Sequence, residues 1–148
     1  MKRFLTLSFF LIIFSFANQA YAQEDYSALN LFVRFGSDAA INGHYEIPIA
    51  NNLTVSPSAT VAFNFDYMAL GARLDYYFDS LLKLNEPWDI WAGVDTGFVV
   101  IDDNKDYDDF NLNIHAGVEY KFNDTWGIIG EFGGGTSSFG GIGVGIHF

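Results

Sequence analysis

The sequence predicts an all-β protein, an eight-stranded antiparallel up-and-down transmembrane β-barrel. Three observations predict this fold class. Apolar and polar residues alternate at period two along most of the chain, one of the two faces is poor in lysine, and aromatic residues gather near both ends of the expected strands. After Gln23, no stretch shows the 3.6-residue apolar period of an amphipathic helix over three turns.

The composition narrows the class of protein before any motif is considered. The chain has 148 residues, half of them hydrophobic, which fits one domain and excludes intrinsic disorder. It contains no cysteine, which excludes a disulfide scaffold, thiol catalysis and zinc–thiolate sites. With 7 Lys and Arg against 18 Asp and Glu, the chain lacks the clustered cations that nucleic-acid binding requires.

The first 22 residues have the features of a cleaved secretory signal peptide. Lys2 and Arg3 give a positive start, residues 4–16 are nearly all apolar, and residues 20–22 read Ala-Tyr-Ala before Gln23. An apolar run of this length spans only about 20 Å as a helix, whereas a bilayer core is about 30 Å thick. We therefore expect cleavage after residue 22, which leaves residues 23–148 as the barrel domain.

Eight alternating segments predict the strands, and clusters of Gly, Asn, Asp, Ser and Pro separate them. The clearest alternation lies between Phe110 and Phe122, and Trp91 is an apolar exception on an otherwise polar face. The expected strands are residues 29–36, 41–49, 53–64, 68–78, 89–100, 110–122, 126–132 and 141–148. The expected turns are residues 36–38, 50–52, 64–66, 79–87, 102–109, 123–124 and 133–138.

The polar face decides between a soluble barrel and a membrane barrel, because both have this alternation. Water-facing strands usually carry many lysines, whereas residues 23–148 contain only Lys83, Lys105 and Lys121. The polar face consists mainly of Gly, Ser, Thr, Asn and Ala with a few charges of both signs, as expected inside a narrow eight-stranded barrel. We therefore expect Leu112 and Ile114 to face lipid.

The polar residues expected to form a network in the lumen are Arg34, His44, Glu46, Arg73, Asp75, Asp95, Glu119, Lys121, Glu131 and His147. Two interpretations of this network are open: a gated path for ions, or a set of ion pairs that fills the lumen. The second is favoured because eight strands leave no room for a solute channel. Pairing is expected in either case, because an unpaired buried charge costs several kcal/mol.

Aromatic residues are expected to form two girdles at the membrane interfaces. One end should carry a girdle centred on Phe78, Trp88, Tyr120, Phe122, Trp126 and Phe148, together with Tyr76 and Tyr77. The other end should carry Phe35, Phe63, Phe65, Tyr67, Phe98, Phe110, Phe132 and Phe139. A soluble core would gather Phe and Trp at its centre instead.

The end of the sequence adds a third indication of a membrane barrel. Ile142, Val144, Ile146 and Phe148 lie on one face and resemble the terminal strand that the barrel-assembly machinery recognises in bacterial outer-membrane proteins. We expect these four residues to act as the assembly signal.

The sequence also resembles the small outer-membrane β-barrels of the OmpA and OmpX type, over the whole of residues 23–148. The segments that carry the resemblance, to members from Bacteroidota, are residues 71–78, 88–93 and 120–128. The resemblance implies a monomer in the outer membrane of a Gram-negative cell, with both termini in the periplasm. It implies outer-membrane lipids as partners, together with periplasmic chaperones and the barrel-assembly machinery during insertion. It also implies a structural or surface-interaction role. The segment 79–87 is long for a periplasmic turn of this family.

No motif predicts catalysis, a metal or a cofactor. Residues 102–109 place oxygen ligands at alternate positions, but Tyr107 stands where a calcium loop needs glycine and Asn113 where it needs glutamate. This segment is therefore expected to be an acidic outer loop. The glycine-rich stretch 133–145 precedes no helix, so it cannot form a phosphate-binding loop.

Two alternatives to a structural outer-membrane barrel are left open. One is a secreted soluble β-barrel that binds an apolar small ligand. The other is a lipid-modifying outer-membrane enzyme, which is disfavoured because no serine lies at a diagnostic spacing from His115 or His147. We therefore expect a protein that is not an enzyme.

Overall fold

The computed structural model describes residues 27–36, 39–102, 110–136 and 140–148. The expected signal peptide lies outside these residues, as do Phe139 and residues 103–109 of the expected acidic loop. No helix within the described ranges is both long and apolar enough to span a membrane.

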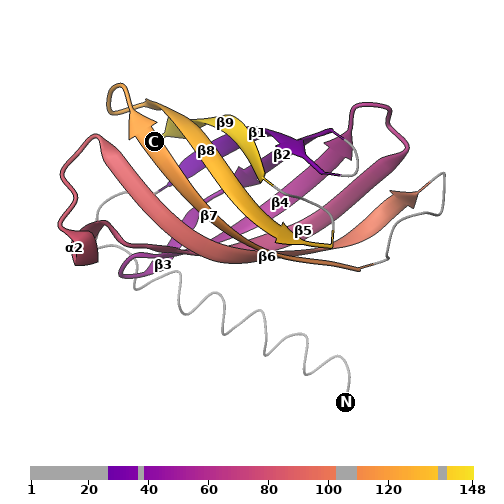
Figure 1. Ribbon diagram of the computed structural model, residues 1–148, viewed down its shortest axis with the longest axis horizontal. Coiled ribbons are helices and arrows are strands. Elements are labelled where there is room, and N and C mark those ends of the chain that lie inside the picture. Colours follow the sequence, from indigo (N-terminus) through magenta and orange to yellow (C-terminus); the bar gives the residue numbers. More distant parts are fainter. Residues whose placement is uncertain (1–26, 37–38, 103–109, 137–139) are drawn as a thin grey trace, which may run out of the picture.

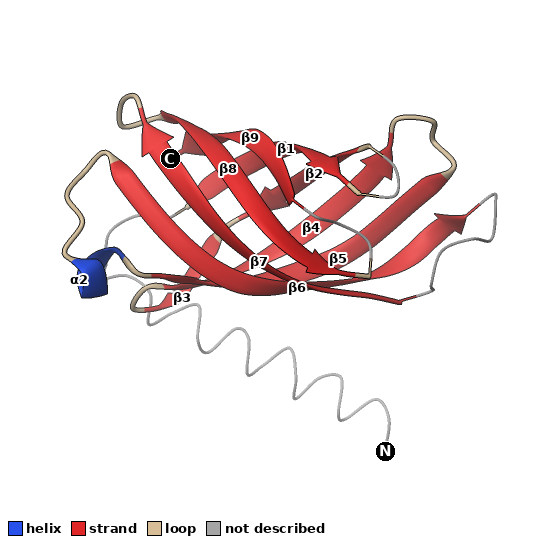
Figure 2. Cartoon of the chain, viewed as in Figure 1, coloured by secondary structure: helices blue, strands red, loops and turns tan. Residues whose placement is uncertain are grey.

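Most described residues belong to one antiparallel sheet, and among them a single short helix interrupts the sequence of strands (Figures 1 and 2). In chain order the elements are β1 (Ala28–Phe35), β2 (Ala40–Tyr45), β3 (Ile47–Ala50), β4 (Leu53–Ala62), β5 (Tyr67–Tyr77), α2 (Asp79–Leu82), β6 (Trp88–Asp102), β7 (Phe110–Lys121), β8 (Trp126–Gly135) and β9 (Gly140–His147).

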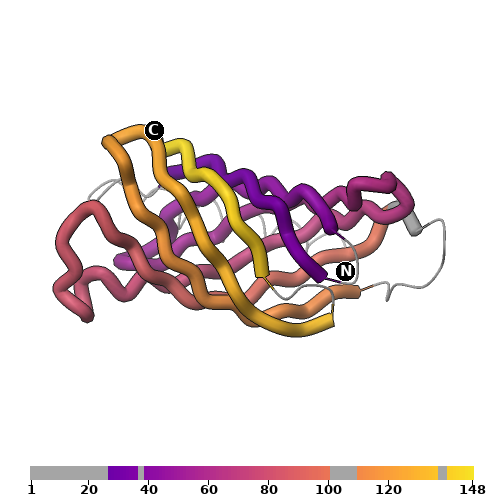
Figure 3. Tube along the Cα trace, turned by 45° about the horizontal axis from the view of Figure 1, so that its top comes forward, coloured from indigo at the N-terminus to yellow at the C-terminus, as the bar shows by residue number. Residues whose placement is uncertain are grey.

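Pairing between the first and last strands closes the sheet into a barrel. β1 pairs with β9 from Ala28 opposite His147 to Phe35 opposite Gly140. β2 and β3 follow each other along one wall of the barrel, and both pair with β4. The barrel therefore has eight staves, with strands that run obliquely across it (Figure 3), and the predicted fold class is confirmed.

The wall formed by β2 and β3 is interrupted at Glu46, although the sequence predicts one continuous strand over residues 41–49. The Glu46 N–H donates to the Ala28 carbonyl of β1 at 2.8 Å. Because backbone groups alternate sides along a strand, the N–H and C=O of Tyr45 face β4 instead. The register there, with His44 opposite Ser58, places Pro57 opposite Tyr45. Proline has no N–H to donate, which explains the interruption.

Two further boundaries differ from the sequence prediction. β8 continues to Gly135, although residues 133–135 were expected in a loop, and these glycines pair with Asn113, Ile114 and His115 of β7. A Cβ at Gly133 would collide with the Ile114 carbonyl oxygen, so the absence of a side chain permits the close pairing. The expected turn over residues 79–87 contains the one-turn helix α2, in which no residue is buried.

The orientation of side chains is as the sequence predicts. On β7, the side chains of Leu112 and Ile114 are 52% and 65% exposed on the outer surface, whereas Asn113 and Glu119 are buried. The alternation of outward apolar residues with more buried polar, small or aromatic ones recurs along β1, β5 and β9. The barrel therefore has an apolar outside and a polar inside.

Aromatic side chains cluster at both ends of the barrel's outer surface. At the end that carries α2, called the α2 end below, the ring of Tyr120 packs on Trp88 and Phe122, with centroids 4.9 and 5.6 Å apart. Phe98 and Phe110 pack together at the opposite end, 5.4 Å apart. The remaining expected members at the α2 end, Trp126, Phe148, Tyr76 and partly buried Phe78, also lie on the outside.

The prediction for two tyrosines is wrong. Tyr77 and Tyr67 were expected in the girdles, but their side chains are buried inside the barrel, 3% and 7% exposed. They occupy inward-facing positions of β5, two and eight residues from Asp75. Tyrosine is amphipathic, and a polar interior can accommodate it because its hydroxyl group forms a hydrogen bond there. The Tyr77 hydroxyl donates to Glu46, and the Tyr67 hydroxyl accepts from the Asn111 amide.

The four residues expected to form the assembly signal share the outer face of β9 and its end. Ile142 and Val144 are exposed, Ile146 is partly buried, and Phe148 follows directly after the strand. The Phe148 N–H donates to the Ser27 carbonyl at 3.2 Å, and its ring lies 6.4 Å from that of Tyr45. These residues therefore form one apolar stripe beside the seam between β9 and β1.

Replacement of an outward-facing residue by a cation tests the apolar surface. We expect Ile114→Arg to lower the free energy of unfolding in bilayers by about 2–4 kcal/mol, because the guanidinium group would lie in hydrocarbon. Thr125→Arg in the exposed turn before β8 is the control and should change the stability little. Urea titration of the folded protein in lipid vesicles measures both variants. Equal stability of the two would contradict a lipid-facing position for Ile114.

Candidate functional site

The middle of the barrel interior holds a group of six ionisable side chains, called the ionic cluster below. They come from five different strands, and all six residues are buried. Members of the cluster are Arg34 of β1, Arg73 and Asp75 of β5, Asp95 of β6, His115 of β7 and Glu131 of β8. The alternation of each strand turns these residues inward, and closure of the barrel brings them together.

Arg73 is the centre of the ionic cluster. Its Nη2 donates to Glu131 Oε2 at 2.7 Å, and its Nε donates to Asp75 Oδ2 at 3.3 Å. The His115 ring lies against the same groups: Nε2 contacts Asp75 Oδ1 and Arg73 Nη2, and Nδ1 lies 3.1 Å from Asp95 Oδ2. Arg73 is 2% exposed, so its charge is stabilised by these partners rather than by water.

Arg34 supplies the second arginine of the ionic cluster. Its Nη2 lies 3.3 Å from Glu131 Oε1 and 3.4 Å from Asp95 Oδ2. Glu131 therefore bridges the two guanidinium groups, one through each carboxylate oxygen. Two arginines face three carboxylates, and His115 lies between two of those carboxylates. The arrangement satisfies the requirement that buried charges be paired.

His115 belongs to the ionic cluster, although it was not among the residues expected in the lumen network. Its inward direction follows from its position between Ile114 and Ala116 on the most regular strand, two residues from Asn113. Its contacts with both Asp75 and Asp95 depend on the pairing of β5, β6 and β7, which the sequence alone does not give.

A second buried group surrounds Glu46 at the α2 end of β2. Its two carboxylate oxygens accept from Asn30 Nδ2 and from the Tyr77 hydroxyl, each at 2.6 Å. His44, another expected member of the network, lies 3.7 Å from Glu46 Oε1 and stacks on Phe32 with ring centroids 5.4 Å apart. Neither Asn30 nor Tyr77 was in the expected network.

The sequence predicts a polar interior, but the interior also contains a group of apolar side chains. Phe32, Tyr77, Trp91 and Ile129 form an apolar cluster inside the barrel, and each is at most 3% exposed. Trp91, the noted exception on the polar face, does face inward. Its indole occupies the space that a side chain at Gly117 would fill. A mainly polar inward face can therefore carry a large aromatic residue where the neighbouring strand has a glycine.

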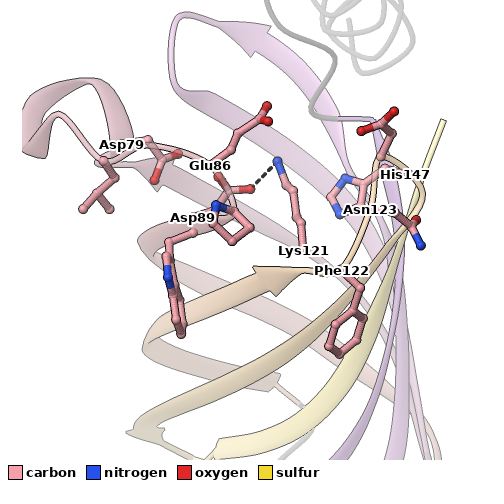
Figure 4. A pocket seen from close by; sticks show the side chains of 11 residues that line it. Asp79, Glu86, Asp89, Lys121, Phe122, Asn123 and His147 are labelled. Carbon is pink, nitrogen blue, oxygen red and sulfur yellow. Dashed lines mark ion pairs between the residues drawn. The ribbon is translucent and has the colours of Figure 1, made fainter.

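The α2 end of the lumen opens into a pocket of about 630 Å³ (Figure 4). Lys121, of the expected network, pairs with Asp89 at 2.6 Å, and His147 Nε2 lies 2.8 Å from Glu119 Oε1. Asp79, Glu86 and Asp124 also line this pocket, so with Asp89 four carboxylates face one lysine there. Within the described part of the chain, no group of three or more potential ligands is arranged to hold a metal ion.

Asp79 ties the long connection after β5 to this pocket. Its Oδ1 accepts from the Ile90 N–H at 2.9 Å, whereas Oδ2 is buried and has no hydrogen-bond partner among the described residues. Burial is the main cause that raises the pKa of Asp79 from 3.8 to about 6. Asp89 raises it further, against the opposing effect of the bond from Ile90.

Comparison with known proteins supports the fold. A scan against models of protein families gives no match, and a search of curated proteins gives none. Among solved structures, one from "De novo design of transmembrane beta-barrels" matches with a TM-score of 0.64 and 12% sequence identity. The match covers 85% of this chain and 98% of the designed one. At this identity the likeness concerns the fold alone.

The closed eight-stave wall, the apolar outer surface and the paired charges inside define a transmembrane β-barrel.

Removal of one charge from the ionic cluster should be strongly destabilising. We expect Glu131→Gln to lower the free energy of unfolding by about 3–5 kcal/mol, because Arg34 and Arg73 would lose the carboxylate they share. Glu86→Gln, at an exposed position, is the matched control. Urea unfolding in detergent micelles, followed by tryptophan fluorescence, measures both. A loss below about 1 kcal/mol, the size expected for an exposed pair, would contradict this role.

Asp79 should make the folded protein less stable as the pH rises. Because its pKa is higher in the folded protein than the ordinary 3.8, folding favours the protonated form. The contribution of Asp79 to stability is therefore greatest below about pH 4 and is lost as the pH rises through about 6.

Asp79→Asn stays neutral and keeps the oxygen that accepts from Ile90. We expect it to be more stable than the wild type at pH 8, with a difference that disappears at pH 4. Unfolding titrations at both pH values measure this difference. Asp124→Asn, at an exposed position, should show no such trend, and a constant difference for Asp79→Asn would refute the assignment.

Proposed function

We propose that this chain is an integral outer-membrane β-barrel of a Gram-negative cell, with a filled interior and a structural or surface-interaction role in the envelope. The membrane-barrel fold supports the membrane location. The resemblance of residues 71–78, 88–93 and 120–128 to small barrels of the OmpA and OmpX type supports the outer membrane in particular.

The observation that carries the proposal is the inverted distribution of side chains. Leu112, Ile114 and Phe132 are more than half exposed, whereas Arg73 and Asp75 are at most 2% exposed. In water, this arrangement would expose an apolar surface around the whole barrel and bury charges at a cost. In a bilayer, the same arrangement places hydrocarbon against hydrocarbon. It also argues against the soluble alternative, whose ligand cavity would need an apolar lining.

A structural role is favoured over transport because the interior is occupied. The ionic cluster crosses the lumen from β1 to β5 and β8, and the apolar cluster around Trp91 occupies further space. An eight-stranded barrel has only enough interior volume for its own side chains. We therefore propose that the protein is neither a solute channel nor an enzyme, and that its contacts are outer-membrane lipids and, during insertion, chaperones and the assembly machinery.

Cell fractionation and gel mobility test the proposal together. The protein should be recovered with outer membranes, partition into the detergent phase, and migrate differently on gels before and after boiling, since folded membrane barrels resist dodecyl sulfate. Recovery in the aqueous fraction without detergent would overturn the membrane assignment. Planar-bilayer recordings of the refolded protein should show no steady conductance, and a steady conductance would overturn the filled interior.

A further inference from the structure

The interruption at Glu46 leaves one backbone acceptor without its ladder donor. The Tyr45 carbonyl faces β4 at the position of Pro57, which has no N–H. The ladder resumes only at Ile47, opposite Val55. In a membrane-spanning wall, an unsatisfied carbonyl group costs several kcal/mol.

Two hydroxyl groups beside this interruption also lack partners. Thr54 and Ser56 lie on the inward face of β4 and are 0% exposed. Neither Thr54 Oγ1 nor Ser56 Oγ has a hydrogen-bond partner among the groups that the structure describes. Ser56 adjoins Pro57 in the chain, so its hydroxyl group lies on the lumen side of the interrupted pairing.

Arg73 supplies a donor on the neighbouring strand. It lies directly opposite Ser56 in the register of β4 and β5, and Asp75 lies opposite Thr54. The Nε and Nη2 of Arg73 bind Asp75 and Glu131, whereas Nη1 has no partner within the described residues. Donors and acceptors without partners among the described residues therefore belong to side chains at paired positions of β4 and β5.

We propose that this place is a binding site for internal water, held by Thr54 Oγ1, Ser56 Oγ, Arg73 Nη1 and the Tyr45 carbonyl group. Buried water characteristically makes two to four hydrogen bonds to polar groups that would otherwise be unsatisfied. Water can donate to acceptors such as the carbonyl group and accept from donors such as the guanidinium group. This inference is independent of the role of the barrel in the envelope.

Water fits these four groups better than an ion does. The ionic cluster already pairs the charge of Arg73 with Asp75 and Glu131, so the site has no excess charge for an anion to neutralise. The other three groups are neutral and can each bind a neutral donor or acceptor. No carboxylate is free to bind a cation here, because both nearby carboxylates already have partners. Asp75, opposite Thr54, is bound to Arg73 and His115. Glu46, opposite Ser56, accepts from Asn30 and Tyr77.

The sign of a stability change tests the site. Thr54→Val keeps the shape of the side chain and removes the hydroxyl group. If the hydroxyl group binds water, we expect the folding equilibrium constant in detergent micelles to fall about fivefold to tenfold, the net effect of one lost hydrogen bond. If it binds nothing, removal of an unsatisfied group should leave the constant unchanged or raise it, and that result would overturn the proposal.

Thr60→Val on the same strand is the matched control, because Thr60 Oγ1 accepts a direct bond from Asn42 Nδ2 at 2.9 Å. It calibrates the loss that a partnered hydroxyl group produces. A crystal structure of the wild type provides the second measurement and does not depend on the folding of a variant. Density for water within hydrogen-bond distance of Thr54 Oγ1 and Ser56 Oγ is expected, and a dry site would overturn the proposal.

Discussion

Closure of β1 onto β9 is the constraint on which the rest of this structure depends. A sheet in a bilayer cannot leave an edge unpaired, because no water is present to satisfy its N–H and C=O groups. The eight paired residues from Ala28 to Phe35 remove both edges at once. Closure also creates two environments, lipid outside the barrel and a narrow lumen inside it. Each strand must therefore present apolar groups to the lipid and mainly polar or small groups to the lumen, which requires alternation in the sequence.

The narrow interior determines which inward-facing residues are possible. Arginines long enough to reach across the lumen, such as Arg34 and Arg73, find carboxylates on strands distant in the sequence. Large side chains are accommodated where the neighbouring strand carries glycine: Gly117 makes room for Trp91, and Gly93 for the Asp75 carboxylate. The ion pairs and the apolar cluster thus fill one space, and the small residues in the sequence are part of the same packing.

The place where this pattern fails is local and has a physical cause. Pro57 cannot donate to the Tyr45 carbonyl group, so one stave is divided into β2 and β3. The hydroxyl groups of Thr54 and Ser56, which have no hydrogen-bond partner among the described residues, face the lumen and not the lipid. A defect on the polar side of the wall can be repaired by water, whereas the same defect on the lipid side could not.

The sequence by itself determined the all-β class, the number of staves and the face of nearly every residue, because period-two alternation is a local property that closure does not alter. Of the ten residues expected in the lumen, eight are buried, and Lys121 and His147 are partly exposed at the α2 end. The tertiary structure alone decided the partners, because the register of eight strands sets which charges meet. It likewise decided the inward positions of Tyr67 and Tyr77, since a tyrosine suits either a girdle or a polar interior, and the division at Glu46, which depends on a proline in another strand.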